Sequence, residues 1–259
     1  MNEVDHFQFE KEITIITTSW DDGGVLDLKL AKLLKEYGIP ATFYIPIKNL
    51  EWNSPFYRHM NNAQIQEIAK NFDVGGHTYS HVNLRDLPFK EAETEVFESK
   101  KRLEEIIDKE LTTFSYPGGK YNDEIVDIVR RAGFKIARTT RTLRTEVKDP
   151  MRMGTTLHVC GRSLTQYLKD LISSRNPIFS YFILRSLHDL AKVRWYDLAM
   201  ATLRYVVEKG GVWHMWGHAW EIEKYNEWKN LREIFTVLGR LSMNKNVHML
   251  NNSQLISIC

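Results

Sequence analysis

The chain has 259 residues, of which 43% are hydrophobic and 26% are charged, the composition of a globular protein that can bury a sizeable core. The 35 Lys and Arg residues nearly balance the 33 Asp and Glu residues, which leaves a formal net charge of +2. This balance argues against nucleic acid or a membrane surface as the main partner.

The two cysteines, Cys160 and Cys259, stand far apart, and no CxxC spacing is present. Neither a disulfide framework nor a thiolate zinc site is expected, and both are interpreted as free thiols. Residues 1–11 lack the basic and apolar segments of a secretory signal, and no later run approaches the roughly 18 apolar residues of a membrane span. We expect a cytoplasmic protein without a transmembrane segment, provided that Met1 is the native start.

Short β-branched or aromatic runs alternate with helical patterns along the whole chain. Strands are expected over 13–18, 41–46, 73–76, 112–116, 134–139, 155–159, 211–216 and 246–250. Helices are expected over 26–37, 62–70, 89–109, 124–132, 164–209 and 227–242. Such repeats predict an α/β fold, an irregular (β/α) barrel of seven or eight parallel strands that spans residues 1–259 as one domain.

The stretch 164–209 is longer than one crossover helix needs, so we expect a helical insertion there. Its aromatic-rich piece, 178–184, is expected to pack in the core of a helical pair. A lid or a lipid-facing surface is the alternative interpretation of that piece.

Active sites of such barrels gather at the carboxyl ends of the strands. The first strand is followed by Asp21, Asp22 and two glycines. Adjacent carboxylates in a tight turn point in different directions, so one could bind a metal while the other reaches the water held there. The alternative is a turn that only caps the next helix.

The third strand is followed by His77 and His81, which have the HxxxH spacing. On one helical turn the two imidazoles would lie on the same side and could bind a zinc-like ion. A lone pair of this kind can also be an ordinary surface or capping pair. Together with a carboxylate from another strand end, however, two histidines leave open positions for water and substrate.

The fourth strand is followed by Pro117, Gly118 and Gly119, whose backbone N–H groups could donate to a developing oxyanion, with Tyr121 as a further substrate contact. The alternative is an ordinary strand-to-helix turn. After the seventh strand, His218 lies where an active-site acid belongs, whereas His214, inside the strand, is expected to be a core residue.

Three arginines, Arg138, Arg141 and Arg144, follow the fifth strand. Such a cluster could hold a phosphate, as in a nucleotide sugar or a lipid-linked sugar. A solvated basic loop is the alternative, and it is the favoured one.

Together these segments resemble the polysaccharide deacetylase family, carbohydrate esterase family four, whose shared unit is the NodB homology domain. The resemblance runs from Thr17 to at least His218. The two acids of the family motif T-F-D-D-G are matched by Asp21 and Asp22, and H-[ST]-x-x-H is matched by residues 77–81. The resemblance implies that Asp21 is the general base.

The same resemblance implies that Asp22, His77 and His81 bind a divalent metal, Zn²⁺ in the first place, with cobalt, nickel, iron or manganese as alternatives. It also implies that the Gly118 N–H is the oxyanion donor and that His218 is the general acid.

The chain departs from the family pattern in its later motifs. Ser115 stands where the family motif R-x-P-x-G has an Arg that is expected to orient the general base. The last motif, L-x-x-H-D, is represented by residues 216–219, in which His218 is not followed by Asp. For the motif with an acidic residue near a Trp, Trp195 is the candidate.

The expected function is metal-dependent hydrolysis of an N-acetyl or N-formyl group on an amino sugar or sugar conjugate, with no nucleic acid as partner. A cytoplasmic location favours a small or lipid-linked sugar over a polymer. One alternative is a barrel that binds a carbohydrate without turnover, and another is hydrolysis of a non-sugar amide. The oligomeric state is not predicted.

Overall fold

The computed structural model describes residues 13–48, 54–160, 164–173, 180, 183–185 and 194–258. The expectations for residues 1–11, for Cys259 and for most of 178–184 lie outside these residues.

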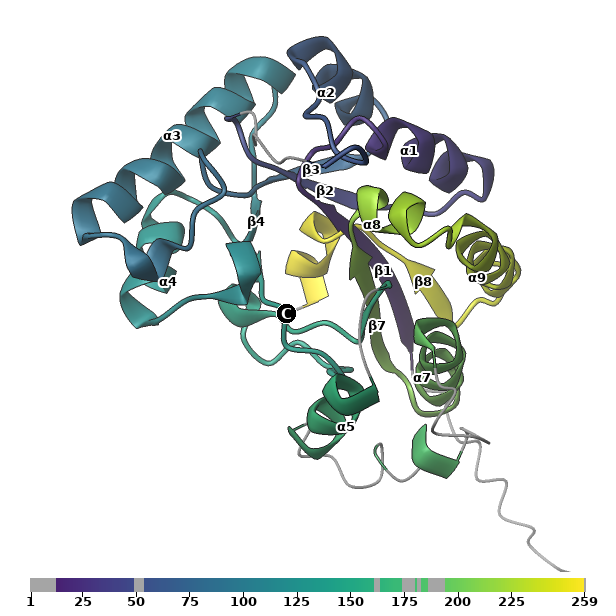
Figure 1. Ribbon diagram of the computed structural model, residues 1–259. Helices are drawn as coiled ribbons and strands as arrows, with labels where there is room; N and C mark the ends of the chain where they lie inside the picture. The colour runs from purple at the N-terminus through teal and green to yellow at the C-terminus, as the bar shows by residue number, and fades with distance from the viewer. Residues whose placement is uncertain are drawn as a thin grey trace, which may run out of the picture.

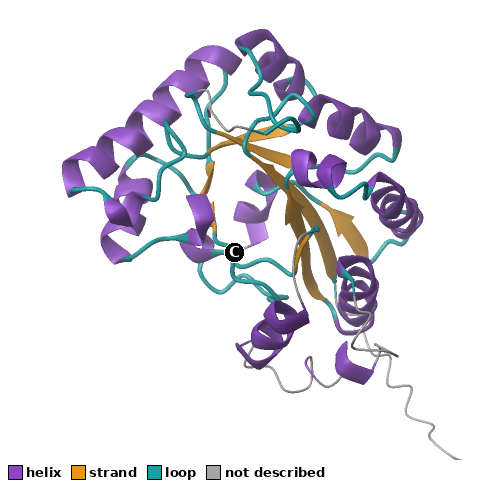
Figure 2. Ribbon diagram, in the orientation of Figure 1, coloured by secondary structure: helices purple, strands orange, loops and turns teal. Residues whose placement is uncertain are grey.

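The predicted α/β barrel is confirmed, since parallel strands form a sheet that curls into a half-barrel with helices around it (Figures 1 and 2). The strands are β1 (Thr14–Asp21), β2 (Thr42–Ile45), β3 (Asp73–Gly76), β4 (Thr113–Ser115), β5 (Ile136–Arg138), β6 (Leu157–His158), β7 (Gly211–Gly217) and β8 (Val247–Met249). Their order is β5-β4-β3-β2-β1-β7-β6, and β8 pairs with β1. All of these pairings are parallel, so the carboxyl ends of the strands share one rim.

Strand β1 lies inside the sheet and pairs with three other strands. It pairs with β7 over Thr14–Trp20, with β2 over Ser19–Asp21 and with β8 over Thr14–Ile16. Nearly all of its residues are buried, which agrees with the near-continuous apolar and β-branched run that a strand covered on both faces needs. The aspartates that follow this run therefore emerge at the middle of the rim.

A single segment connects the two edges of the sheet. The Met153 N–H donates to the Ala137 carbonyl at 2.9 Å, and the Met153 carbonyl accepts from the Thr139 N–H at 2.8 Å. Three residues later, the Thr156 N–H donates to the His214 carbonyl of β7 at 2.8 Å. The chain thus passes from β5 to β7 just before β6 and ties the barrel edges together.

The helices lie on the outside of the sheet (Figure 1). They are α1 (Asp27–Glu36), α2 (Asn62–Ala69), α3 (Phe89–Ile107), α4 (Asp123–Arg131), α5 (Leu164–Ser173), α7 (Trp195–Lys209), α8 (Ala219–Lys224) and α9 (Trp228–Leu241). Short 3₁₀ turns are η1 (Leu84–Asp86), η2 (Pro117–Gly119), η3 (Pro150–Arg152) and η5 (Ser253–Ile258). Helix α8 was not predicted from the sequence. Among the described residues no helix is both long enough and apolar enough to cross a bilayer.

The expected insertion, 164–209, ends in a helix that packs on the barrel. Helix α7 contacts β6, β7 and β1, and it buries Trp195, Leu198 and Val206. It is placed as the crossover helix between β6 and β7. Of the rest of the insertion, the structure describes helix α5, residue 180 and residues 183–185.

Candidate functional site

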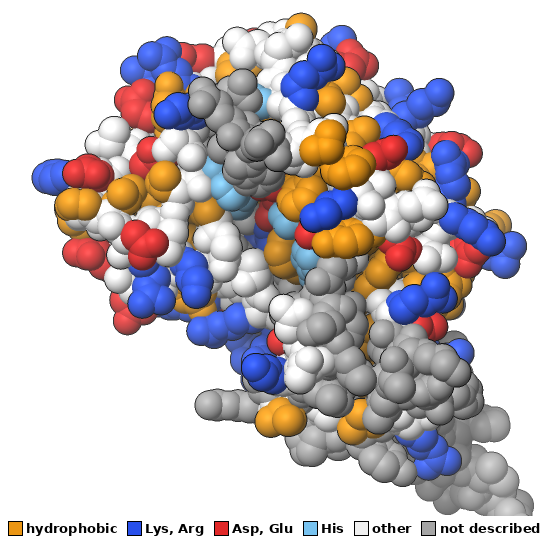
Figure 3. Space-filling model, in the orientation of Figure 1, with side chains coloured by type: hydrophobic (Ala, Val, Ile, Leu, Met, Phe, Trp, Pro, Cys, Tyr) orange, Lys and Arg blue, Asp and Glu red, His pale blue; other side chains and the backbone are white. Residues whose placement is uncertain are grey.

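Two strand ends bring three potential ligands together. Asp22 follows β1, and His77 and His81 follow β3. The Asp22 Oδ1 atom lies 3.7 Å from His77 Nε2 and 3.1 Å from His81 Nε2. These three ligand atoms lie within 4.8 Å of one another. Figure 3 shows histidine side chains gathered in a hollow near the centre of this face.

The donor atoms fit a divalent cation. Asp22 Oδ1 is buried and makes no hydrogen bond to the described residues. The Nδ1 atom of His77 lies 2.8 Å from the Ser115 carbonyl, so Nδ1 carries the hydrogen and Nε2 offers its lone pair toward Asp22. Burial alone would raise the pKa of Asp22, but His218, His77 and His81 outweigh it and hold this pKa well below its usual range. One carboxylate and two imidazoles suit zinc-like ions.

The loop that carries the histidines is irregular, so the expected helical turn is wrong. Residues 77–83 have no helical assignment, and Thr78 and His81 have φ angles of 61° and 56°. Glu95 of α3 holds the loop in place, because its carboxylate accepts from the Ser80 N–H at 2.8 Å and the Ser80 hydroxyl at 2.6 Å. Left-handed φ values are rare for residues other than glycine and tend to occur at functional sites.

Asp22 is itself held in a left-handed conformation, with φ 81°. Its carbonyl accepts from the Tyr57 hydroxyl at 2.8 Å. Its Oδ2 atom accepts from the Trp220 indole N–H at 3.0 Å. Since Oδ2 is occupied in this way, Oδ1 is the oxygen turned toward the two histidines.

Asp21, the last residue of β1, is buried beside Asp22 and pairs with Arg138 through Oδ2. The arrangement corrects the expectation for Arg138, because this residue ends β5 inside the barrel and is 0% exposed. It belongs neither to a solvated loop nor to a phosphate cluster. Arg141, in contrast, is exposed and lies over the Tyr121 ring, 5.3 Å from its centroid.

His218 lies directly before α8, with its Nε2 3.6 Å from Asp22 Oδ2. Its Nδ1 donates to Glu221 at 2.6 Å, and His158 Nε2 lies 3.3 Å from the same carboxylate oxygen. Burial acts to lower the pKa of His218, but Asp22 and Glu221 outweigh it and raise this pKa to about 9. The imidazole is therefore protonated at neutral pH.

Two contacts of this site were missed in the sequence, Trp220 and Glu221. Both follow His218 closely, and the spacing of three between His218 and Glu221 is the signal that could have identified the pair once a helix was placed there. Trp195, the earlier candidate for the motif with a Trp, instead begins α7 and packs on Tyr196. His214 is buried in β7 and lies 2.8 Å from the Ser19 hydroxyl, in a core position as expected.

The turn after β4 lies at the same rim, because the Ser115 carbonyl that precedes it contacts His77. Pro117 is buried, and Gly118 and Gly119 have φ angles of 59° and 66°. Two backbone hydrogen bonds close the turn, from Gly119 to the Tyr116 carbonyl and from Lys120 to the Pro117 carbonyl. Donation by the Gly118 N–H to a substrate stays a prediction.

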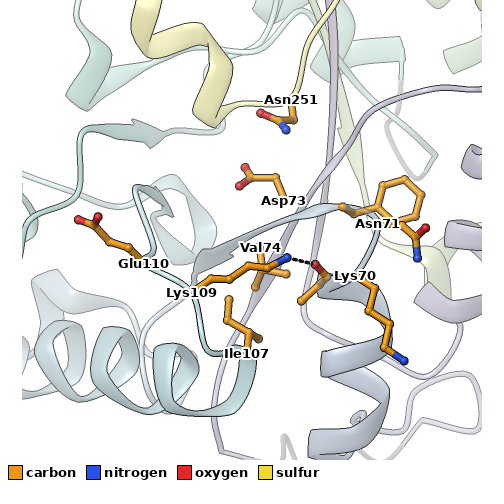
Figure 4. Close-up of a pocket in the computed structure, with 10 residues that line it drawn as sticks. Lys70, Asn71, Asp73, Val74, Ile107, Lys109, Glu110 and Asn251 are labelled. Atoms are coloured by element: carbon orange, nitrogen blue, oxygen red, sulfur yellow. Dashed lines mark hydrogen bonds between the residues drawn. The ribbon is translucent and has the colours of Figure 1, made fainter.

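The pocket in Figure 4 is a separate feature at the opposite end of β3. It has a volume of about 290 Å³ and is lined by residues that include Asp73, Lys109, Glu110 and Asn251. Lys109 donates across it to the Ala69 carbonyl at 2.5 Å. Because Asp73 is the first residue of β3 and His77 follows the last, this pocket does not contribute to the rim site.

Comparisons with known proteins point to one family. A family model described as polysaccharide deacetylase matches residues 10–137. A relative named "Putative polysaccharide deacetylase YxkH", from Bacillus subtilis (strain 168), is 28% identical over 127 residues, which are 48% of this chain. The chain covers 44% of that relative's length.

Solved structures share the fold. The crystal structure of a "putative polysaccharide deacetylase from Mycobacterium smegmatis" matches with a TM-score of 0.66 at 14% identity, over 96% of this chain and 91% of that one. A family 4 acetyl xylan esterase from Clostridium thermocellum, solved in complex with a cobalt ion, matches with a TM-score of 0.58 at 12% identity, over 95% and 91% of the two chains.

Proposed function

The chain belongs to the polysaccharide deacetylase family, and we propose that it is a metal-dependent hydrolase that removes an N-acetyl or N-formyl group from an amino sugar or sugar conjugate. The observation that carries this proposal is the convergence of Asp22, His77 and His81 beside two groups suited to proton transfer, Asp21 and His218.

The metal proposed for this site is Zn²⁺, with cobalt, nickel, iron or manganese as alternatives. Asp22, His77 and His81 would hold it, and it would supply Lewis-acid activation of water and of the acyl carbonyl. The cobalt ion in the Clostridium thermocellum esterase supports a divalent cation on this fold.

Two side chains of this protein accept and donate the protons. Asp21 accepts a proton from the attacking water, since its Oδ1 is buried and makes no hydrogen bond to the described residues, whereas Oδ2 is paired with Arg138. His218 donates a proton to the departing amine, and the Glu221 carboxylate, which accepts from its Nδ1 at 2.6 Å, favours the protonated imidazole. The Gly118 N–H would meet the negative charge on the acyl oxygen, a contribution of about 3 kcal/mol for a single donor.

The test is release of acetate or formate from a panel of acylated compounds, followed by NMR. The panel holds N-acetylglucosamine, its oligomers, a nucleotide-linked N-acetyl sugar, a formamido sugar, acetylated xylan and simple N-acyl amines. We expect release from at least one amino sugar, loss of that release with a chelator, and recovery with added metal. A metal-loaded protein that binds sugars and releases nothing would be a carbohydrate-binding barrel, and release from non-sugar amides alone would indicate the other alternative.

A further inference from the structure

Arg138 is a buried cation on the barrel interior. Its side chain is 0% exposed, and its guanidinium carbon lies 4.3 Å from the Trp216 ring centroid and 5.4 Å from that of Tyr44. A charge removed from water in this way is costly unless a partner neutralises it. The Asp21 carboxylate neutralises the charge, and the Ser115 hydroxyl accepts a further hydrogen bond from Arg138 Nη2 at 2.5 Å.

The contact with Arg138 gives the two carboxylate oxygens of Asp21 different surroundings. Oδ2 is bound by Arg138, whereas Oδ1 is buried and has no hydrogen-bond partner among the described residues. A guanidinium that binds one oxygen and is itself anchored to a second strand restricts the rotation of the carboxylate. The other oxygen then keeps a defined direction, which is what a general base requires.

Ser115 and Arg138 are direct neighbours in the sheet. They end β4 and β5, and they face each other in register. In neighbouring parallel strands such residues point to the same side and stand about 5 Å apart. A guanidinium placed on either strand can therefore reach Asp21, provided that the other position carries a small residue.

We propose that Arg138 is the positioning residue of Asp21, and that it replaces, from β5, the arginine that is absent from β4 at Ser115. The proposal rests on the proposed function for the role of Asp21. The cation that the altered motif lacks at Ser115 is thus present on the neighbouring strand.

The exchange of the two residues is the decisive test. Arg138→Ser should lower kcat for hydrolysis of 4-nitrophenyl acetate, and of the best sugar from the panel, at least about 100-fold, since a misplaced reacting group costs about that much. Ser115→Arg alone should also be impaired, because it buries a second guanidinium at one carboxylate. The double variant Ser115→Arg/Arg138→Ser should recover at least tenfold over Arg138→Ser, with KM and bound metal unchanged.

Two results would overturn the proposal. One is an Arg138→Ser protein with a kcat within twofold of the wild type. The other is an exchanged protein that is folded, metal-loaded and no faster than Arg138→Ser. If Arg138→Ser does not fold, Arg138→Lys replaces it as the reference, since an ammonium group keeps the charge and loses the planar fork. Arg240→Ser, an exposed position on α9, is the matched control and should change nothing.

A second measurement does not depend on activity. If Arg138 neutralises Asp21, removing the cation leaves a buried unpaired carboxylate, and Asp21→Asn should then recover part of the lost stability. The Asp21→Asn/Arg138→Ser protein should unfold at a higher urea concentration than Arg138→Ser alone. A urea midpoint of the double variant that is equal to or lower than that of Arg138→Ser would refute the pairing of Arg138 with Asp21. A wild-type protein that hydrolyses no substrate would refute the proposed function, and this unfolding comparison would still decide the pairing.

Discussion

At the scale of single residues, the two adjacent aspartates differ in the side chain that binds each carboxylate. Asp21 is bound by Arg138 from β5, and Asp22 is bound by Trp220 from α8. Each contact occupies one carboxylate oxygen, and the other oxygen makes no hydrogen bond within the described part of the chain. The same chemical group can therefore serve as base at one position and as metal ligand at the next.

The Trp220 contact makes a prediction about metal affinity. Trp220→Phe removes the indole N–H that holds Asp22 Oδ2 and keeps most of the ring. Groups that orient a ligand are typically worth 10- to 100-fold in metal affinity, so we expect the dissociation constant for Zn²⁺ to rise about tenfold, measured by competition with a chelating dye.

The control for this variant is Trp228→Phe. Its indole N–H also donates to a carboxylate, that of Glu223, at 2.5 Å, and no ligand candidate is involved. This control should bind metal as the wild type does. Equal affinities for Trp220→Phe and the wild type would show that Asp22 does not depend on the contact.

The two roles assigned to the rim residues can be separated by mutation. Asp21→Asn should retain metal and lose turnover by about 100-fold or more, the usual worth of a general base. His77→Ala should lose both metal and turnover. Metal content by mass spectrometry and acetate release are measured on the same samples, and an Asp21→Asn protein of undiminished rate would remove Asp21 from the mechanism.

Sequence patterns were sufficient for the residues that lie directly after strands. Asp21, Asp22, His77, His81 and His218 come from three strand ends, and the structure places them at one rim. Arg138 was misjudged because its partner is set by cross-strand register, which no local pattern reveals. Together with Arg141 and Arg144 it forms a sequence pattern that favours a basic loop.

At the scale of elements, β3 carries a histidine loop at one end and a partly buried acid at the other. Asp73 begins the strand, and its carboxylate accepts from the Thr42 hydroxyl at 2.8 Å. Burial raises the pKa of Asp73 to about 6. This pKa is above that of the same carboxyl in the unfolded chain. Protonated Asp73 therefore contributes to stability below about pH 4, and this contribution is lost as the pH rises through 6.

Asp73→Asn should therefore stabilise the protein in a pH-dependent way. At pH 7 to 8 the neutral amide avoids the cost of desolvating a charge. The free energy of unfolding should rise by about 1 to 2 kcal/mol, which is less than the roughly 3 kcal/mol that two pKa units represent. At pH 4 the gain should vanish. Urea unfolding at both pH values measures this, and a gain that is equal at pH 4 and pH 8 would contradict the assignment of the cause to ionisation.

The elements themselves were predicted with uneven success. Strands with β-branched runs and the long amphipathic helices were located within a few residues. Helix α8, of six residues, was missed because it offers less than two turns of hydrophobic periodicity. The HxxxH spacing predicts a helical turn, but an irregular loop with left-handed residues, held by Glu95, has the same spacing.

At the scale of the whole molecule, the barrel is the part that alternation of strands and helices predicts well. A barrel was expected, but the segment that links its two edges was not predicted. The segment that joins β5 to β7, residues 153–158, contains the two-residue strand β6 and meets β5 at an isolated bridge between Met153 and Arg138. Such irregular pairing depends on the shape of the finished barrel rather than on any local periodicity.

The candidate metal site also links distant parts of this barrel. Its ligands come from the loops after β1 and β3, so a bound cation ties strands on either side of β2. Free metal at about 100 times its dissociation constant stabilises a folded protein by about 2.7 kcal/mol. Chelation should lower the melting temperature by about 5 to 10 °C. The same chelator should leave His77→Ala unchanged, and an equal shift in both proteins would place the stabilising metal elsewhere.

The most direct test of the account is the position of the cation. Crystals grown with Co²⁺ or Zn²⁺ are measured by anomalous diffraction at the absorption edge of the metal. We predict one strong peak between Asp22 Oδ1, His77 Nε2 and His81 Nε2, at about 2.0 to 2.2 Å from each atom. A map from fully metal-loaded protein with no peak at these three side chains would contradict the account.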